Sequence, residues 1–479
     1  MLFNSIDFAI FLPIVFVLYW HVMQKNLKFQ NLFLVLASYL FYGWWDWRFL
    51  SLIFFSTGVD FWVGLQMQGQ TRLRRKVLLW ISIIVNLGFL GFFKYYNFFL
   101  DNLIKSFSFF GATLQADSLQ IILPVGISFY TFQTLSYSID VYRGKLEPTR
   151  DFISFAAFVS FFPQLVAGPI ERATNLLPQF FEERKFDSIK AVDGCRQILW
   201  GLFKKIVVAD NCAELANRIF NNYDTFHGST LLLGAIFFAF QIYGDFSGYS
   251  DIAIGTSRLF GFNLMRNFAF PYFSRDIAEF WRRWHISLST WFRDYIYIPM
   301  GGSGGNSWKS LRNIFVIFVV SGFWHGANWT FVFWGLLNAI YFIPLYLSNR
   351  NRSNLDTVAE HKMLPSLREA LQMSATFFLT LIAWVFFRSG SLADAVHYLQ
   401  IMFSRSIFLA PQIQNKQLIV VPFLLVLIGS EWLQRDKQHA LQFEGTNLRL
   451  GLRWGVYYAL IFAIVFFGGS QQDFIYFQF

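Results

Sequence analysis

A histidine within a long uncharged run is the residue of this sequence best suited to chemistry. The stretch from Asn313 to Asn349 contains no Asp, Glu, Lys or Arg, and His325 lies inside it in the motif Ser-Gly-Phe-Trp-His-Gly-Ala-Asn-Trp. An ionisable side chain in a run of hydrocarbon-spanning length is costly, so it is a functional candidate by default. Imidazole titrates near neutral pH, which suits it to act as a general base or as a nucleophile.

The position of His325 within the run predicts a broken helix. From Asn313 to Trp324 a helix would rise about 18 Å, at about 1.5 Å per residue, whereas the hydrocarbon core is about 30 Å thick. Gly326 and Asn328 are poor helix formers, and a break at that depth must face protein or water. We expect His325 at the base of a water-accessible cavity that Trp324 and Asn328 also line. The alternative is a histidine that only hydrogen-bonds to a neighbouring helix.

A second histidine lies in the aromatic and basic segment from Phe280 to Tyr295. Read as one continuous helix, this segment places its large side chains on one face at three- and four-residue spacing, namely Trp281, Trp284, His285, Leu288, Phe292 and Tyr295. We expect a helix at the membrane interface or in a re-entrant region, with His285 facing the same cavity as His325 and Arg282 lining a substrate funnel. The alternative is an interfacial anchor with Trp and Arg at headgroup level.

Two carboxylates interrupt another apolar run. They follow directly on residues 231–242, a stretch too short to cross a bilayer alone. The candidate funnel-lining side chains of this polar insert are Tyr243, Asp245, Ser247, Tyr249 and Asp251. The two carboxylates could line a funnel or pair with Arg282, Arg283 or Arg293, and we favour structural ion pairing.

The composition predicts an all-α polytopic membrane protein. The 479 residues are 55% hydrophobic and only 14% charged, compared with about 25% charged in ordinary soluble domains. Long uncharged runs argue against an outer-membrane barrel, which shows ten-residue alternation. We interpret residues 1–479 as a single membrane domain of about 11–13 transmembrane and re-entrant helices around a central funnel.

The apolar runs locate the expected spans, and the most polar stretches, 171–193 and 349–370, are expected as surface loops with amphipathic helices. The first span is expected to be retained, because it lacks a basic leader and a small-residue cleavage site. Spans are predicted over residues 6–20, 31–45, 49–66, 77–93, 119–135, 152–168, 196–208, 230–244, 313–347, 373–387, 418–432 and 452–468.

Basic residues predict the orientation. The loops at 21–30 and 67–76 both carry Lys or Arg and are separated by two spans. The positive-inside rule makes their shared face cytoplasmic and the N-terminus extracytoplasmic. The same rule explains the net charge of +10 without nucleic acid as a partner.

Several common sites are absent from the sequence. There is no phosphate-binding Gly-rich loop, dinucleotide fingerprint, His-Glu-x-x-His or Gly-x-Ser-x-Gly motif, which argues against an ATP-driven pump and a serine hydrolase. Cys195 and Cys212 lack the spacing of zinc ligands, so we expect no metal. We also expect no bound cofactor. The segment 162–172 is rich in Pro and Gly and predicts a helix end and a turn. The remaining histidines are expected to be solvated: His21, His227, His361, His397 and His439.

Taken together, these segments resemble the membrane-bound O-acyltransferase family, in its branch of bacterial cell-envelope O-acetyltransferases and D-alanyl transferases. The matching segments run through the whole chain in order: 1–5, 37–45, 123–133, 162–170, 243–253, the two histidine motifs and the closing 474–477. The resemblance implies that His325, in Trp-His-Gly, is catalytic and that His285, in Trp-His-Ile-Ser, is the second functional residue.

The resemblance also implies the reaction. A short acyl group, most simply acetyl, would pass from a cytoplasmic thioester such as acetyl-coenzyme A across a bacterial inner membrane to an extracytoplasmic polysaccharide. A separate periplasmic or extracellular partner of the SGNH type would assist, and lipid would surround the protein. His325 could deprotonate the acceptor hydroxyl or take the acyl group itself. His285, Asn328 or backbone amides at the break could stabilise the oxyanion.

Other functions remain alternatives at this point. The chain could be a passive channel that conducts an acyl donor to a separate extracellular transferase, with both histidines structural. It could also transfer D-alanyl groups, or acylate lipids within the bilayer.

Overall fold

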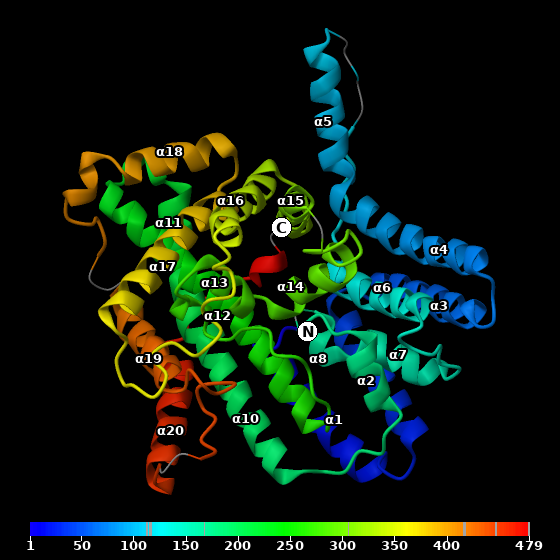
Figure 1. The fold of residues 1–479 in the computed structure, drawn as a ribbon. Coiled ribbons are helices and arrows are strands. Elements are labelled where there is room, and N and C mark those ends of the chain that lie inside the picture. The colour runs from blue at the N-terminus through cyan, green and yellow to red at the C-terminus, as the bar shows by residue number, and fades with distance from the viewer. Residues whose placement is uncertain are drawn as a thin grey trace. The chain divides into compact units, whose positions relative to one another are not determined.

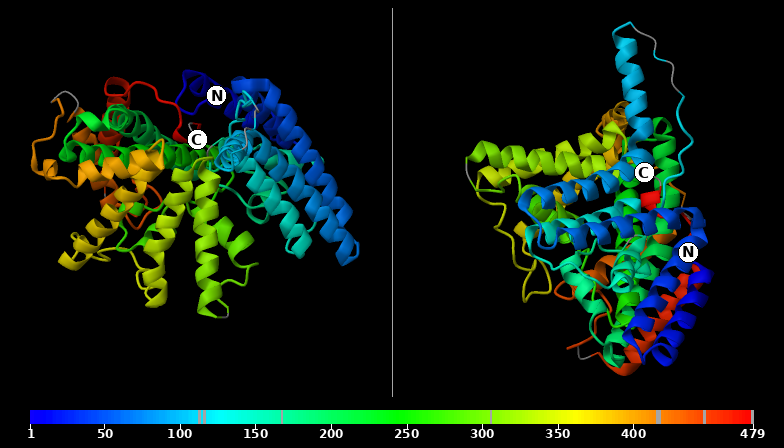
Figure 2. Two further views of the ribbon diagram at one scale, coloured as in Figure 1. Left: turned by 90° about the horizontal axis from the view of Figure 1, so that it is seen from above. Right: turned by 90° about the vertical axis from the view of Figure 1, so that its right-hand side faces the viewer.

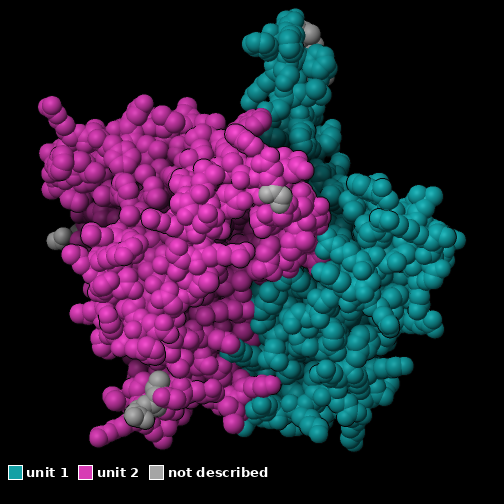
Figure 3. Space-filling view, viewed as in Figure 1, with its two compact units in different colours: residues 1–188, 257–265 teal, residues 189–256, 266–479 magenta. Residues whose placement is uncertain are grey.

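The computed structural model describes residues 1–479 except 112, 113, 115, 116, 167, 305, 415–417, 446, 447, 478 and 479. Within these described residues the regular structure is helical, with no β-strand, as the composition predicted. The chain divides into two compact units, residues 1–188 with 257–265 and residues 189–256 with 266–479 (Figure 3). Among the described residues, five helical stretches are long and apolar enough to span a membrane: Leu27–Met67, Arg72–Phe109, Gly228–Leu259, Trp329–Leu347 and Leu367–Arg388.

The first unit is a helical bundle in which three helices, α3, α4 and α6, lie side by side (Figure 1; Figure 2). Asp60 of α3 is fully buried and accepts hydrogen bonds from Ser82, Asn86 and Ser138. Such polar contacts hold helices together where apolar packing alone gives no preference for protein over lipid. The helices of this unit are α1 (Ile6–Val17), α2 (Leu27–Asp46), α3 (Leu50–Met67), α4 (Arg72–Leu90), α5 (Tyr96–Phe109), α6 (Ile127–Arg143), α7 (Phe152–Ser160), α8 (Phe162–Leu165) and α9 (Ala173–Leu176).

Two of the expected spans in this unit differ from the observed helices. The run 119–135 was expected as a helix, but α6 begins only at Ile127, after Gly126 with its φ of +75°. The run 152–168 is divided at Phe161 into α7 and α8. The predicted helix end and turn in 162–172 is confirmed by the end of α8 at Leu165, while Ala167 lies outside the described residues.

The second unit contains both histidine motifs. Its helices are α10 (Ser188–Leu202), α11 (Asp210–Asn221), α12 (Gly228–Leu259), α13 (Ile277–Arg283), α14 (Ile286–Phe292), α15 (Ser307–His325), α16 (Trp329–Leu347), α17 (Leu367–Arg388), α18 (Leu392–Met402), α19 (Val420–Leu433) and α20 (Leu450–Phe466). A π-helical segment, Phe203–Ala209, joins α10 to α11, and another, Arg293–Tyr297, follows α14. The polar insert at 243–251 does not interrupt a span, since α12 continues through it to Leu259.

The helices α15 and α16 form a hairpin whose turn is the predicted break (Figure 1). Gly322 and Gly335 allow the two backbones to approach closely. A Cβ atom at Gly322 would lie 2.2 Å from the carbonyl oxygen of Phe331, and one at Gly335 would lie 2.2 Å from that of Phe318. The close approach therefore holds α15, which ends at His325, against α16.

Replacing Gly322 by Ala is expected to lower the midpoint of thermal unfolding in detergent by several degrees. The added methyl group would overlap backbone atoms that cannot move without separating α15 from α16, a cost of about 1–3 kcal/mol. Gly429→Ala is the matched control, because a Cβ atom there meets no atom within 4 Å and alanine favours the helix. Equal midpoints for the two variants would contradict the close approach.

Candidate active site

The second histidine motif is not one continuous helix. The expectation of a single helix over 280–295 is wrong, because α13 ends at Arg283 and α14 begins at Ile286. His285 lies in the break with φ 43° and ψ 54°, in the left-handed region. Residues other than glycine seldom adopt this conformation, and surrounding contacts must hold them there.

The helix before the break is anchored by charge. Asp276 caps α13 by accepting a hydrogen bond from the backbone of Glu279. The buried carboxylate of Glu279 pairs with Arg275 at 3.0 Å and with Arg283 at 2.8 Å. These contacts fix the end of α13, and therefore the residue at which the chain turns.

Residues 267–269, which precede α13, form hydrogen bonds with the chain at the break. The backbone N–H of Ile286 donates to the carbonyl oxygen of Asn267, and that of Ala269 donates to the carbonyl oxygen of Arg283, both at 2.9 Å. The side-chain oxygen of Asn267 lies 3.0 Å from Nδ1 of His285. The backbone groups released by the interrupted helix are thus paired again, as burial requires.

The imidazole of His285 is buried among aromatic rings. Its exposed fraction is 1%, and its ring lies edge-on to Phe246 with centroids 4.6 Å apart. Nε2 has no hydrogen-bond partner among the described residues. Burial lowers the pKa of His285, which lies outside the candidate spans, to about 3. The ring is therefore neutral at neutral pH.

The imidazole of His325 lies at the C-terminal end of α15 and is also buried, with 2% exposure. It packs edge-on to Trp324, Trp334 and Phe387, at centroid distances of 4.9, 5.1 and 5.4 Å. The helix break expected at Gly326 is confirmed, because α16 begins at Trp329.

The structure brings the two histidines together. Their ring centroids are 6.5 Å apart, although forty positions separate them in the chain. Tyr476, near the C-terminus, has its ring 5.6 Å from that of His325 and 6.5 Å from that of His285. Trp324 also packs against both imidazoles. Helix ends from α13, α14 and α15 and the C-terminal segment therefore form one imidazole centre.

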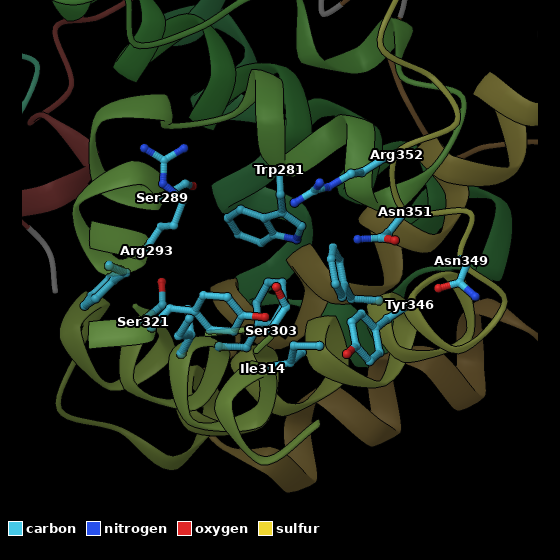
Figure 4. Close-up of a pocket in the computed structure, with 15 residues that line it drawn as sticks. Trp281, Ser289, Arg293, Ser303, Ile314, Ser321, Tyr346, Asn349, Asn351 and Arg352 are labelled. Carbon is cyan, nitrogen blue, oxygen red and sulfur yellow. The ribbon is translucent and has the colours of Figure 1, made fainter. Parts of the chain in front are cut away.

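The second unit contains a cavity of about 570 Å³, whose lining residues are drawn in Figure 4. Ser321, four residues before His325, and Ser289, four residues after His285, both line it. Neither imidazole is part of its lining. Six of its fifteen lining residues are aromatic, and two are arginines, Arg293 and Arg352 (Figure 4). Arg293 also pairs with Asp294 at 2.8 Å.

The carboxylates of the polar insert form buried ion pairs. Asp251 pairs with Lys204 at 2.5 Å, and Asp245 pairs with Lys205 at 2.9 Å. The ion pairing that the sequence analysis favours is therefore present. The partners, however, are lysines and not Arg282, Arg283 or Arg293. The unbroken α12 directs both carboxylates toward the π-helical segment Phe203–Ala209, where adjacent lysines meet them.

The other expected funnel residues of this insert also make internal contacts. The hydroxyl of Tyr243 donates to Glu431 at 2.8 Å, and Nζ of Lys204 donates to Ser247 at 2.9 Å. The ring of Tyr249 lies 4.3 Å from that of Phe474. None of these side chains lines the cavity described above.

Arg282 and Asn328 hold backbone segments. The exposed guanidinium of Arg282 donates to the carbonyl oxygens of Asn351 and Asn354, at 2.8 and 2.6 Å. Asn328 caps α16 by accepting from Thr330 and donates to the carbonyl oxygen of Gly390. Arg282 does not line the cavity either.

The expectation that His439 is solvated is wrong, and sequence reasoning missed two residues of the site. His439 is not solvated: its exposure is 1%, and its Nε2 lies 3.0 Å from Asp193. The residues that sequence reasoning missed are Asn267 and Tyr476. Asn267 lies in no motif, and Tyr476 lies in the closing segment 474–477, to which the resemblance gave no role. The contacts of both residues depend on distant parts of the chain.

Comparison with known proteins decides the family. Residues 148–364, which include both histidines, match the model of the membrane-bound O-acyltransferase family. The probable alginate O-acetylase AlgI of Pseudomonas aeruginosa is 40% identical over 409 residues, covering 84% of this chain and 75% of that protein. The chain belongs to the membrane-bound O-acyltransferase family.

Other family members show the same relationship. The peptidoglycan O-acetyltransferase of Helicobacter pylori is 36% identical over 432 residues, covering 84% of this chain and 79% of that protein. The teichoic acid D-alanyltransferase of Streptococcus thermophilus is 29% identical over 292 residues, covering 56% of this chain and 69% of that protein. The chain is thus a membrane-embedded O-acyltransferase, as the sequence motifs implied.

Replacing Lys205 by Met is expected to destabilise the protein by about 3–5 kcal/mol, because it leaves buried carboxylates without a counter-charge. Lys205 is 1% exposed and lies 2.9 Å from both Asp210 and Asp245. The measurement is the thermal unfolding midpoint in detergent. The control is Lys437→Met, since Lys437 is partly exposed and pairs with its neighbour Asp436 at 3.3 Å. A Lys205→Met protein as stable as this control would contradict the structural role of the pairs.

Proposed function

We propose that this membrane-bound O-acyltransferase transfers an acetyl group from a cytoplasmic thioester, acetyl-coenzyme A, toward a hydroxyl of an extracytoplasmic polysaccharide. The observation that carries the proposal is the pair of buried imidazoles, 6.5 Å apart at two helix breaks. The relatives named for alginate and peptidoglycan O-acetylation support acetyl as the group and a cell-envelope glycan as the acceptor.

The separation of the imidazoles suits a hydroxyl or thioester between them. Two hydrogen bonds of about 2.8 Å through one oxygen span at most about 5.6 Å. Ring centroids 6.5 Å apart allow one oxygen to reach nitrogen atoms of both rings. In the transfer, the hydroxyl loses its proton to imidazole, its oxygen bonds to the thioester carbonyl carbon, the carbon–sulfur bond breaks and the thiolate leaves. His325 and His285 are the catalytic residues of this proposal.

The cavity described above is the proposed donor site. Arginine binds phosphate through charge-assisted hydrogen bonds, and Arg293 and Arg352 line a cavity that ends one turn from each histidine. Coenzyme A carries several phosphate oxygens on a long flexible arm. In this proposal the arginines hold the phosphates while the arm extends the thioester toward the imidazoles.

Charge along the α15–α16 hairpin supports a cytoplasmic mouth for this cavity. Lys309 and Arg312 lie near the start of α15, and Arg350 and Arg352 follow the end of α16, so all four lie at the same end of the hairpin. The positive-inside rule makes that end cytoplasmic. The other end of the hairpin carries His325 and lacks Lys and Arg.

The remaining parts of the proposal concern compartments and partners. We place the protein in the bacterial inner membrane with the N-terminus outside. The charged donor cannot cross hydrocarbon, so only the acetyl group passes through the imidazole centre. A separate extracytoplasmic partner of the SGNH type assists this transfer to the glycan.

Replacing His325 by Ala is expected to abolish transfer of label from acetyl-coenzyme A in a reconstituted system with partner and acceptor. Loss of a histidine that takes part in the proton transfer of the reaction costs about 10²–10⁴-fold in rate. His397→Ala is the control, since that histidine is 53% exposed, and it should retain full activity. Unchanged transfer by the His325→Ala protein would favour the passive channel. Wild-type protein that accepts only a carrier-bound D-alanyl or a long-chain donor would overturn the acetyl assignment.

Replacing Arg352 by Gln is expected to raise the KM for acetyl-coenzyme A about tenfold or more, because a hydrogen bond to a charged group contributes about 1.5–3 kcal/mol. The value of kcat should change little, since Arg352 lies away from the imidazoles. Arg350→Gln is the matched control: it neutralises the same end of the hairpin at a residue that does not line the cavity. Equal KM values for the two variants would contradict the binding of acetyl-coenzyme A in this cavity.

A further inference from the structure

Asn267 makes several contacts with the break between α13 and α14 that contains His285, and no sequence pattern indicated them. Its side chain is fully buried. Its Oδ1 lies 3.0 Å from Nδ1 of His285, 2.9 Å from the hydroxyl of Ser287 and 3.4 Å from the backbone nitrogen of Ser287. Its Nδ2 donates to the hydroxyl of Ser250 in α12 at 3.0 Å. One amide therefore connects α12 to the turn between α13 and α14.

These contacts determine the orientation of the amide. The backbone N–H of Ser287 can only donate, so the atom of Asn267 that faces it is the oxygen. The Nδ2 group then points to Ser250, whose hydroxyl oxygen accepts. A reversed amide would place two N–H groups against each other at Ser287, which a buried site does not tolerate.

The orientation of the amide determines the tautomer of His285. A carbonyl oxygen cannot donate, so the imidazole must carry its proton on Nδ1 and donate it to Oδ1 of Asn267. In a neutral ring this leaves the lone pair on Nε2. That nitrogen is buried and has no hydrogen-bond partner in the described part of the chain. The partner of one ring nitrogen thus defines the chemistry of the other, as it does for histidines that bind metals.

We propose that Asn267 is the positioning residue of the acyl-transfer centre: it holds His285 as the Nδ1–H tautomer and presents Nε2 as the proton acceptor for the hydroxyl that attacks. The inference rests on the function proposed above. Its backbone carbonyl takes part as well, because it accepts from Ile286 and so helps to keep His285 in its left-handed conformation. Asn267 touches neither donor nor acceptor and acts through His285 alone.

The direct test is ¹⁵N NMR of histidine-labelled protein in lipid bilayers, with the His285 signals assigned by their loss in His285→Gln. In the wild type we expect Nδ1 protonated and Nε2 unprotonated. Asn267→Asp keeps an oxygen facing Nδ1 and should keep this tautomer. Asn267→Ala removes the acceptor and should give a mixture of the two tautomers. A protonated Nε2 in the wild type would overturn the proposal without any variant.

Kinetics supply the second readout. Asn267→Ala is expected to lower kcat about 10- to 100-fold, the usual effect of losing such a supporting hydrogen bond, with the KM for acetyl-coenzyme A unchanged. Asn267→Asp should recover most of kcat. The control for lost stability is Asn86→Ala, at a buried asparagine that bonds Asp60; it should lower the unfolding midpoint and leave the His285 spectrum unchanged.

The outcomes separate this inference from the function on which it rests. A changed tautomer in Asn267→Ala with unchanged kcat would overturn the positioning role, and so would an Asn267→Asp protein as slow as Asn267→Ala. Full transfer by a His285→Ala protein would instead overturn the catalytic role of His285, while the NMR spectrum would still report whether Asn267 sets the tautomer.

Discussion

A helix that stops inside an apolar protein interior must find new partners for its freed backbone groups, and this requirement shapes the imidazole centre. Both histidines lie at such interruptions, His285 between α13 and α14 and His325 at the end of α15. Asparagines form hydrogen bonds with the freed backbone groups. Asn267 accepts from the backbone at the first break, and Asn328 caps the helix that follows the second break. Ending two helices at one place is what allows two imidazoles to meet there.

Buried ion pairs hold the helices around the imidazole centre in place. Lys204 and Lys205 are almost completely buried, and each one pairs with a carboxylate of α12. Breaking such a pair is far more costly than forming it is favourable. The pairs therefore fix the register of α12 against the π-helical segment before α11. The same helix presents Phe246 to His285 and Ser250 to Asn267, so its register controls how the imidazole centre is assembled.

Much of this arrangement could be predicted from the sequence, because it depends on local chemistry. The uncharged run with Gly326 predicted the break after His325, and most apolar runs correspond to helices. The conformation of His285 could not be predicted, since the three- and four-residue spacing of its aromatic neighbours fits an uninterrupted helix equally well. The partners of Asp245 and Asp251 were missed because neighbouring lysines in an apolar stretch give no sign that they are buried. The role of Asn267 depends on three separate segments, which only the fold brings together.

In the proposed mechanism the two imidazoles act as one functional unit, and a double-mutant cycle on acetyl transfer tests this most directly. Rates would be measured for the wild type, His285→Ala, His325→Ala and the double variant, with the unfolding midpoint of each as a control for folding. Residues that act as a unit are strongly non-additive, so the double variant should be about as slow as the slower single variant. Independent effects that multiply in the double variant would contradict a shared centre.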